Sequence, residues 1–335
     1  MNKNIDSCFY DNSFSFIRYF AAFQVLIKHL VIHFNLDLPN CFFSLLDFFS
    51  GVPIFFCLSG FFISNTLNKD KVSGKEYFRK RFIRIFPELW LAILVNDLFL
   101  ILFNSSILSD IKFWLFNITQ GSFFQFWTPD TLRNYGVGTP NGSLWTITLF
   151  IQFYVLIYFL FPKIKDKSVY FHFLLLFSSL IPNVAILFLE QYIPTIVYKL
   201  FLQTIIPYFY LFYIGVIIYL YRNHIIDYLI RYFYFLFIVF ILYSTFLNNF
   251  PSVYMDPIRT SLLCLLTIGF GYKFKTVKIR KDYSFGIYLY HMIFINIFVN
   301  YNVLNNWLGA MFIAIISIIV AIFSNKLFYT YLKIK

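Results

Sequence analysis

Long runs of apolar residues dominate this chain, and several reach about twenty residues with almost no charge. A helix of that length and character is what crossing the hydrocarbon core of a bilayer requires. The runs are apolar on every side instead of alternating with polar positions, which excludes the strands of a membrane β-barrel. The sequence therefore predicts an all-α, polytopic integral membrane protein.

Composition narrows the class further. Of the 335 residues, 60% are apolar and 13% charged, against roughly a quarter charged in a soluble domain. The 49 Phe and 26 Tyr residues carry more aromatic surface than a soluble interior could hide. A soluble enzyme, a DNA-binding protein and a secreted disulfide scaffold are excluded. We interpret Cys8, Cys41, Cys57 and Cys264 as inert thiols, because they form no CxxC pair.

We predict ten membrane-spanning helices in one domain over residues 1–335, with a short cytoplasmic tail at 1–13 and no appended soluble domain. The predicted spans are 14–35, 42–66, 82–104, 143–162, 169–190, 204–221, 228–249, 258–272, 283–301 and 308–330. The longest break, 105–142, contains Trp114, Trp127 and Pro129. We expect it to form an extracytoplasmic or interfacial loop with one amphipathic stretch.

The basic residues predict the orientation. The net charge is +12, and in a membrane protein such an excess reports topology before it reports nucleic acid. With the N-terminus inside, the inner segments hold 20 of the Lys and Arg residues and the outer segments hold 4. Since positive loops resist translocation, both termini are expected in the cytoplasm.

The first predicted span contains four basic or titratable residues, Arg18, Lys28, His29 and His33. An ionisable residue inside a membrane is costly and is a functional hypothesis by default. Arg18 and His29 lie eleven residues apart, which is about three helical turns and about 16 Å along one face. His33 follows one turn further out on the same face as His29.

Three interpretations compete for His29 and His33. Two histidines at this spacing suit zinc, but no Glu, Asp or Cys accompanies them at ligand spacing, so we predict no metal site. They could instead hydrogen-bond to neighbouring helices. Alternatively His29 is a general base, because imidazole is best suited to take a hydroxyl proton near neutral pH. These two residues alone do not decide between the last two.

Three further spans carry unusual residues. Ser59 and Gly60 form a small pair in an aromatic segment, which allows close approach of a backbone or a ligand. Arg81 and Arg84 share a helix face at the cytoplasmic surface, where they could anchor topology or clamp phosphates. His291 is expected about 12 Å into the membrane from the inside.

Taken together, these elements resemble acyltransferase family 3, the polytopic O-acyltransferases that modify bacterial glycans, over nearly the whole chain. The matching positions are, in order, Arg18 with His29, residues 55–61 (FFCLSGF), Arg81 and Arg84 with Pro87, residues 143–145 (SLW) with Phe153 and Tyr154, and residues 284–291 (SFGIYLYH).

Two positions differ from the family pattern. Phe150 stands where many members carry Glu in the fourth helix, and Ser15 replaces the acid usually found before the first-helix Arg. Gln152 is the nearest polar neighbour of Phe150, but on a helix it faces elsewhere. Either the acid is dispensable, or another group such as Asp47 or Asp97 replaces it.

The resemblance implies transfer of an acyl group, most often acetyl, from cytoplasmic acetyl-CoA to a hydroxyl of a bacterial surface polysaccharide such as O-antigen, capsule or exopolysaccharide. It implies the bacterial cytoplasmic (inner) membrane, acyl-CoA as a co-substrate instead of a permanent cofactor, a lipid-linked or surface glycan acceptor, and no nucleic acid. Within it, we expect catalysis by His29 with Arg18, donor binding by Arg81, Arg84, Ser59 and Gly60, and an acceptor pocket of Trp145, Tyr154, His291 and His33.

Two other classes of membrane protein compete with an acyltransferase. A glycan flippase would spread charges along a water-filled lumen, whereas here they cluster in the first span and at the cytoplasmic rim. A lipid-linked glycosyltransferase would need an acidic pair in its first outer loop to bind a metal. The only acid in that loop here is Asp37. The flippase remains the alternative function.

Overall fold

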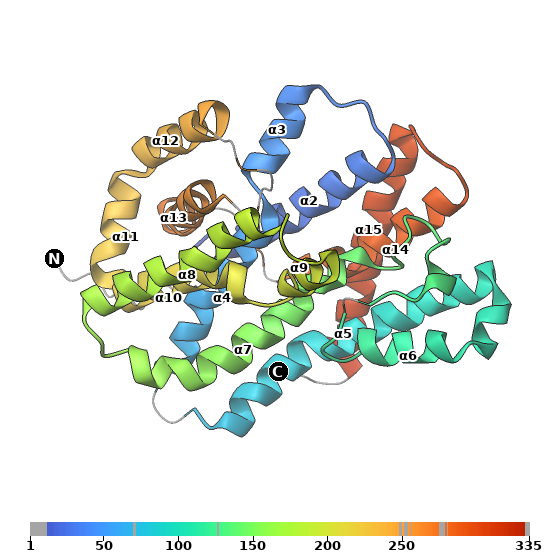
Figure 1. Ribbon diagram of the computed structural model, residues 1–335, viewed down its shortest axis with the longest axis horizontal. Coiled ribbons are helices and arrows are strands. Elements are labelled where there is room, and N and C mark those ends of the chain that lie inside the picture. Colours follow the sequence, from blue (N-terminus) through green and yellow to red (C-terminus); the bar gives the residue numbers. More distant parts are fainter. Residues whose placement is uncertain are drawn as a thin grey trace. The chain divides into compact units, whose positions relative to one another are not determined.

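A computed structural model describes residues 12–69, 72–125, 127–247, 250, 254, 256–274, 279 and 281–331, and every regular element in these ranges is helical (Figure 1). Cys8 lies outside the described residues. The chain divides into two compact units. The first unit comprises Met1–Ala21, Ser44–Val72 and Leu149–Arg280, and the second comprises Ala22–Phe43, Ser73–Thr148 and Lys281–Lys335.

The helices are distributed between the units as follows. The first unit holds α4 (Gly51–Leu67), α8 (Val169–Leu189), α9 (Thr195–Phe201), η4 (Ile206–Tyr208), α10 (Phe209–Leu220), α11 (Arg222–Arg231), α12 (Phe233–Phe246) and α13 (Pro257–Lys273). The second holds α5 (Gly74–Phe103), η1 (Ser105–Ser109), α6 (Ile111–Gln120), η2 (Asp130–Leu132), η3 (Gly142–Leu144), α14 (Ser284–Asn300) and α15 (Trp307–Tyr331). Parts of α2 (Phe14–His33), α3 (Asn40–Phe48) and α7 (Trp145–Ile164) belong to each.

The regular elements of the described residues are all helices, so the predicted all-helical class is confirmed, although the predicted span 42–66 is divided between α3 and α4. Among the described residues, six helices are long and apolar enough to cross a membrane, or up to eight if each of two bent pairs is one span, so the count of ten stays a prediction. The bends measure 52° between α9 and the helix that starts at Ile206, and 72° between α11 and α12. Residues 222–227, which separate two predicted spans, are helical and form the first part of α11.

Gln152 stabilises the first of these bends. Its side-chain amide donates to the carbonyl of Gln203 at 2.9 Å and accepts from the amide of Ile205 at 3.0 Å. A break in a membrane helix frees backbone groups that have no water to bind, so a polar side chain must satisfy them. The polar neighbour of Phe150 therefore has a structural role, and Phe150 itself packs edge-on against Phe56.

The third span begins earlier than its hydropathy predicts. The structure starts α5 at Gly74, where the Ser73 hydroxyl accepts a hydrogen bond from the Glu76 amide. Lys80 then pairs with Glu76 one turn further on, at 2.6 Å. N-capping and this i, i+4 ion pair favour a helix through a charged turn, so Arg81 and Arg84 lie on the helix itself.

Two glycines allow α4 and α10 to cross closely in the first unit. A Cβ atom added to Gly60 would lie 2.0 Å from the carbonyl oxygen of Phe212, and one added to Gly215 would lie 2.1 Å from that of Cys57. Backbones approach this closely in membrane proteins only where small residues face each other. Gly60 therefore lies in the contact between α4 and α10.

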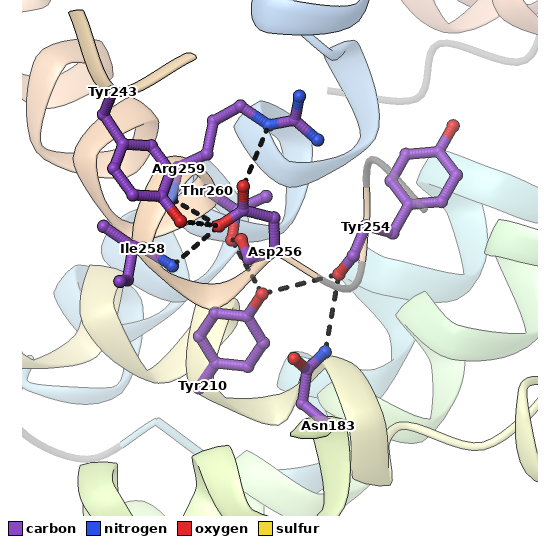
Figure 2. A network of polar contacts seen from close by, with 8 residues as sticks. All are labelled: Asn183, Tyr210, Tyr243, Tyr254, Asp256, Ile258, Arg259 and Thr260. Atoms are coloured by element: carbon purple, nitrogen blue, oxygen red, sulfur yellow. Dashed lines mark hydrogen bonds and ion pairs between the residues drawn. The ribbon is translucent and has the colours of Figure 1, made fainter. Parts of the chain in front are cut away.

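A polar network surrounds the start of α13 in the same unit (Figure 2). The Asp256 carboxylate accepts from the backbone amides of Ile258 and Arg259, at 3.1 and 2.9 Å, and from the Tyr243 hydroxyl at 3.2 Å. Its other oxygen lies 3.7 Å from Arg259 Nε. Tyr210 shares a 2.7 Å hydrogen bond with Thr260. Asp256 is both the N-cap of α13 and the counter-charge of a buried arginine.

We expect Asp256→Ala to lower the free energy of unfolding by about 3–5 kcal/mol, because it removes one partner of a buried ion pair and the helix cap together. Asp256→Asn keeps an acceptor for the cap and is expected to lose less. Thermal unfolding in detergent measures both. Asp130→Ala is the matched control: Asp130 also pairs with an arginine three residues on, but on the surface, where such pairs contribute about 0–1 kcal/mol. Equal losses at both sites would contradict the assignment.

Candidate functional site

Three histidines meet in the second unit. The α2 helix carries His29 and His33, and α14 carries His291. Nδ1 of His29 lies 2.9 Å from Nε2 of His291, and the two rings stack with their centroids 5.1 Å apart. The His33 ring follows at 5.7 Å from that of His29. Residues far apart in sequence thus form one imidazole cluster.

The histidine cluster is partly accessible to solvent. His291 is fully buried, whereas His29 and His33 are each partly exposed. The partner that the structure gives His29 is the imidazole of His291. Within the described part of the chain, no three His, Cys, Asp or Glu side chains come together as metal ligands.

Hydrogen bonds join the SLW segment to α14 beside His291. The Tyr288 hydroxyl donates to the carbonyl of Ser143 at 2.9 Å, and the Ser143 hydroxyl lies 3.1 Å from the carbonyl of Tyr288. Thr146 contacts the Tyr288 hydroxyl at 2.8 Å, and the Asn141 amide donates to the carbonyl of Leu289 at 2.9 Å. Ser143 and Tyr288 therefore fix the helix turn that carries His291.

One asparagine holds the loop that precedes the SLW segment. The Asn296 side chain, in the C-terminal half of α14, donates to the carbonyls of Thr139 and Pro140 and accepts from the amide of Val137 at 2.7 Å. Gly136 has a φ of +56°, and a Cβ there would lie 2.0 Å from the Asn296 oxygen. Only glycine fits both the left-handed backbone and the contact.

The arginines predicted for donor binding and for catalysis lie on two helices. On α5, the Arg81 guanidinium stands over the ring of Tyr77, 5.4 Å from its centre, and Arg84 is exposed. Arg18 lies on the first-unit part of α2, with its guanidinium 5.4 Å from the centre of the Phe62 ring. Both arginines rest on an aromatic face, which orients a guanidinium without neutralising its charge.

Sequence reasoning missed Glu88. This carboxylate lies one helical turn beyond Arg84 on α5, where the Ser324 hydroxyl of α15 donates to it at 3.3 Å. The Tyr290 hydroxyl of α14 donates in turn to Ser324 at 2.9 Å. Gly286 makes room for the carboxylate, because a Cβ there would lie 2.6 Å from its oxygen. The signal was present: Glu88 is one of two acids in the apolar span 82–104, and it lies four residues after a predicted functional arginine.

The other residues predicted for the site are divided between the two units. Ser59, Gly60 and Tyr154 belong to the first unit, and Trp145 to the second. Tyr154 is buried, with its ring 6.2 Å from that of Phe150. Ser59 and Trp145 are partly exposed. Of the predicted set, the structure therefore joins His29, His33 and His291 by direct ring contacts, and the roles assigned to the rest stay predictions.

Comparison with known proteins places the chain in a family. The model of an acyltransferase domain, acyltransferase family 3, matches residues 11–326. Nodulation protein 10 of Rhizobium leguminosarum bv. viciae is 27% identical over 332 residues, covering 91% of this chain and 88% of that protein. The peptidoglycan O-acetyltransferase OatA of Listeria monocytogenes is 28% identical over 116 residues, covering 32% of this chain and 19% of that protein. No solved structure matches significantly. The chain belongs to acyltransferase family 3 and is a membrane acyltransferase.

Proposed function

We propose that this protein is an O-acetyltransferase of the bacterial cytoplasmic membrane. It moves an acetyl group from cytoplasmic acetyl-CoA to a hydroxyl of a surface polysaccharide unit such as O-antigen, capsule or exopolysaccharide. The observation that carries the proposal is the pair of His29 and His291, a partly exposed imidazole held by a buried one. An imidazole so held is suited to take a proton from a hydroxyl.

The proposed orientation follows the basic residues. Ten spans with both termini in the cytoplasm place Arg81 and Arg84 at the inner surface, and their guanidinium groups suit the phosphates of coenzyme A. Arg18 lies about 16 Å from His29 along α2. An extended pantetheine arm is roughly 15–20 Å long, so the thioester reaches His29 while the nucleotide stays in the cytoplasm.

The proton balance of the reaction requires one base. His29 takes the proton of the acceptor hydroxyl, whose oxygen forms a bond to the thioester carbonyl carbon. The carbon–sulfur bond then breaks, and the thiolate of coenzyme A leaves with the proton that His29 returns to it. Because no net proton is left behind, the site needs no proton exit.

The acceptor approaches from the outer side or along the membrane plane. Trp145, partly exposed at the start of α7, presents a ring on which a sugar can stack, and His33 lies one turn outward of His29. Tyr154 is the other aromatic residue proposed for the acceptor. The peptidoglycan O-acetyltransferase relative modifies a glycan, as its name states, which supports a glycan acceptor here.

The surface glycan of a deletion strain tests this function. We expect its mass spectrum and NMR spectrum to lack one O-acetyl group present in the parent, with the sugar chain itself unchanged. Purified protein is expected to release coenzyme A from acetyl-CoA when given membranes that carry the glycan. If the deletion strain instead lacks the glycan at its surface, and the glycan that remains inside the cell is acetylated as in the parent, the result would support the flippase.

A further inference from the structure

We propose that His291 is a positioning residue that selects the reactive tautomer of His29. This inference rests on the proposed function, because it assumes that His29 is the base. It assigns His291 to the support of His29, where the sequence had suggested an acceptor pocket. The geometry that carries it involves three groups: the Ile287 carbonyl and the two imidazole rings.

The Ile287 carbonyl fixes the hydrogen on His291. Nδ1 of His291 lies 3.1 Å from this oxygen, and a carbonyl oxygen only accepts hydrogen bonds. Nδ1 therefore carries a hydrogen. An imidazole buried in an apolar bundle without an anion bound to it is neutral, since an unpaired buried charge is costly. A neutral ring has one hydrogen, so Nε2 of His291 holds a lone pair.

That lone pair determines which ring nitrogen of His29 carries the hydrogen. Nε2 of His291 lies 2.9 Å from Nδ1 of His29, and a hydrogen bond between them requires His29 to be the donor. The hydrogen of His29 is therefore on Nδ1, and its Nε2 is left as the proton acceptor. The opposite tautomer would place the hydrogen on Nε2, where it would face the substrate hydroxyl and abolish base catalysis.

Hydrogen bonds from a neighbouring segment hold the turn of α14 on which this tautomer selection depends. Tyr288 and Leu289, the residues that follow Ile287, are both held through their carbonyls or side chains by the segment at Asn141 and Ser143. The turn of α14 that supplies the accepting carbonyl is thus fixed from outside the helix. His291 is fully buried, so water does not compete for its nitrogens.

Two substitutions of His291 separate positioning from packing. His291→Leu fills the space but offers no acceptor to His29, whereas His291→Gln restores a carbonyl oxygen that can accept. Inverted membrane vesicles carrying the native glycan, supplied with radiolabelled acetyl-CoA, report kcat and KM. We expect His291→Leu to lower kcat by about 10²–10⁴-fold, the range seen when a catalytic base is lost or held in the wrong tautomer. KM for acetyl-CoA should stay within about threefold, and His291→Gln should recover at least about tenfold in kcat.

His172 provides the matched control. It is a buried histidine of the first unit whose Nδ1 lies 2.6 Å from the Tyr213 hydroxyl. His172→Leu and His172→Gln should leave kcat within about threefold once protein amounts are matched. If His172→Leu and His291→Leu lower kcat equally, loss of a buried histidine accounts for the effect and the proposal is overturned.

A double variant decides whether His291 acts through His29. If it does, His29→Ala with His291→Leu has the same residual activity as His29→Ala alone, because residues that work as a unit are not additive. A further tenfold fall in the double variant would overturn positioning. Full activity of His291→Leu beside an inactive His29→Ala would overturn this inference alone. Absence of transfer from acetyl-CoA by the unmodified protein would overturn the proposed function.

Discussion

Replacing His29 with alanine is expected to lower kcat for acetyl transfer by about 10²–10⁴-fold, which is what a general base contributes. The physical reason is that His291, the imidazole hydrogen-bonded to His29, uses both of its ring nitrogens within the protein and so cannot replace His29 as the base. KM for acetyl-CoA should change little, since the phosphates are held elsewhere. The assay measures transfer of labelled acetyl groups in inverted membrane vesicles.

Chemical rescue strengthens this experiment. Alanine leaves a gap at a partly exposed position, so added imidazole should restore part of the activity of His29→Ala and none of that of a bulky His29→Phe. His172→Ala, at a buried histidine of the first unit, is the control for protein quality and should remain active. Normal transfer by a well-expressed His29→Ala protein would remove His29 from the chemistry.

Replacing Gly60 with alanine is expected to prevent accumulation of folded protein. The added Cβ would lie 2.0 Å from the carbonyl oxygen of Phe212 and 3.3 Å from the amide nitrogen of Val216. A backbone oxygen cannot rotate away as a side chain can, so α4 and α10 must separate. Overpacking costs about 1–3 kcal/mol where side chains give way, and we expect more here. Size-exclusion yield and thermal stability in detergent measure the loss.

Gly309→Ala is the matched control for this prediction. Gly309 also lies in a helix, but its added Cβ would meet nothing nearer than a side-chain atom of Phe34 at 3.5 Å. Alanine favours a helix over glycine by about 0.5–1 kcal/mol, so this variant should fold at least as well as the parent. A Gly60→Ala protein that folds normally but has a raised KM for acetyl-CoA would instead support the donor-binding role predicted from the sequence.

The helical segments were predictable because the bilayer imposes length and hydrophobicity on each of them. The bends were not, because hydropathy averages over a window and takes no account of a side chain such as Gln152 that satisfies broken backbone groups. The early start of α5 was also missed. Its first turns are charged, so they form a helix without belonging to the apolar span.

The candidate site was predicted as a set of residues but not as an arrangement. His29, His33 and His291 stand out as titratable groups in apolar spans. Their assembly depends on which face of α14 meets α2, and the weak amphipathic pattern of a helix that is apolar all round does not fix that face. Glu88 could have been recognised from its spacing to Arg84. Asn296 could not, because its partners are backbone groups of a loop.

The clamp that Asn296 and Gly136 form has a consequence for the thermodynamics of substrate recognition. A loop whose backbone is already bound at Val137, Thr139 and Pro140 loses little conformational freedom when a ligand arrives, so association is spared most of the ordering entropy of a flexible loop. Where the acceptor of the proposed function binds at this loop, its selection depends on the shape of a preformed surface. Exchanging this loop between enzymes should transfer sugar preference only when α14 is exchanged with it.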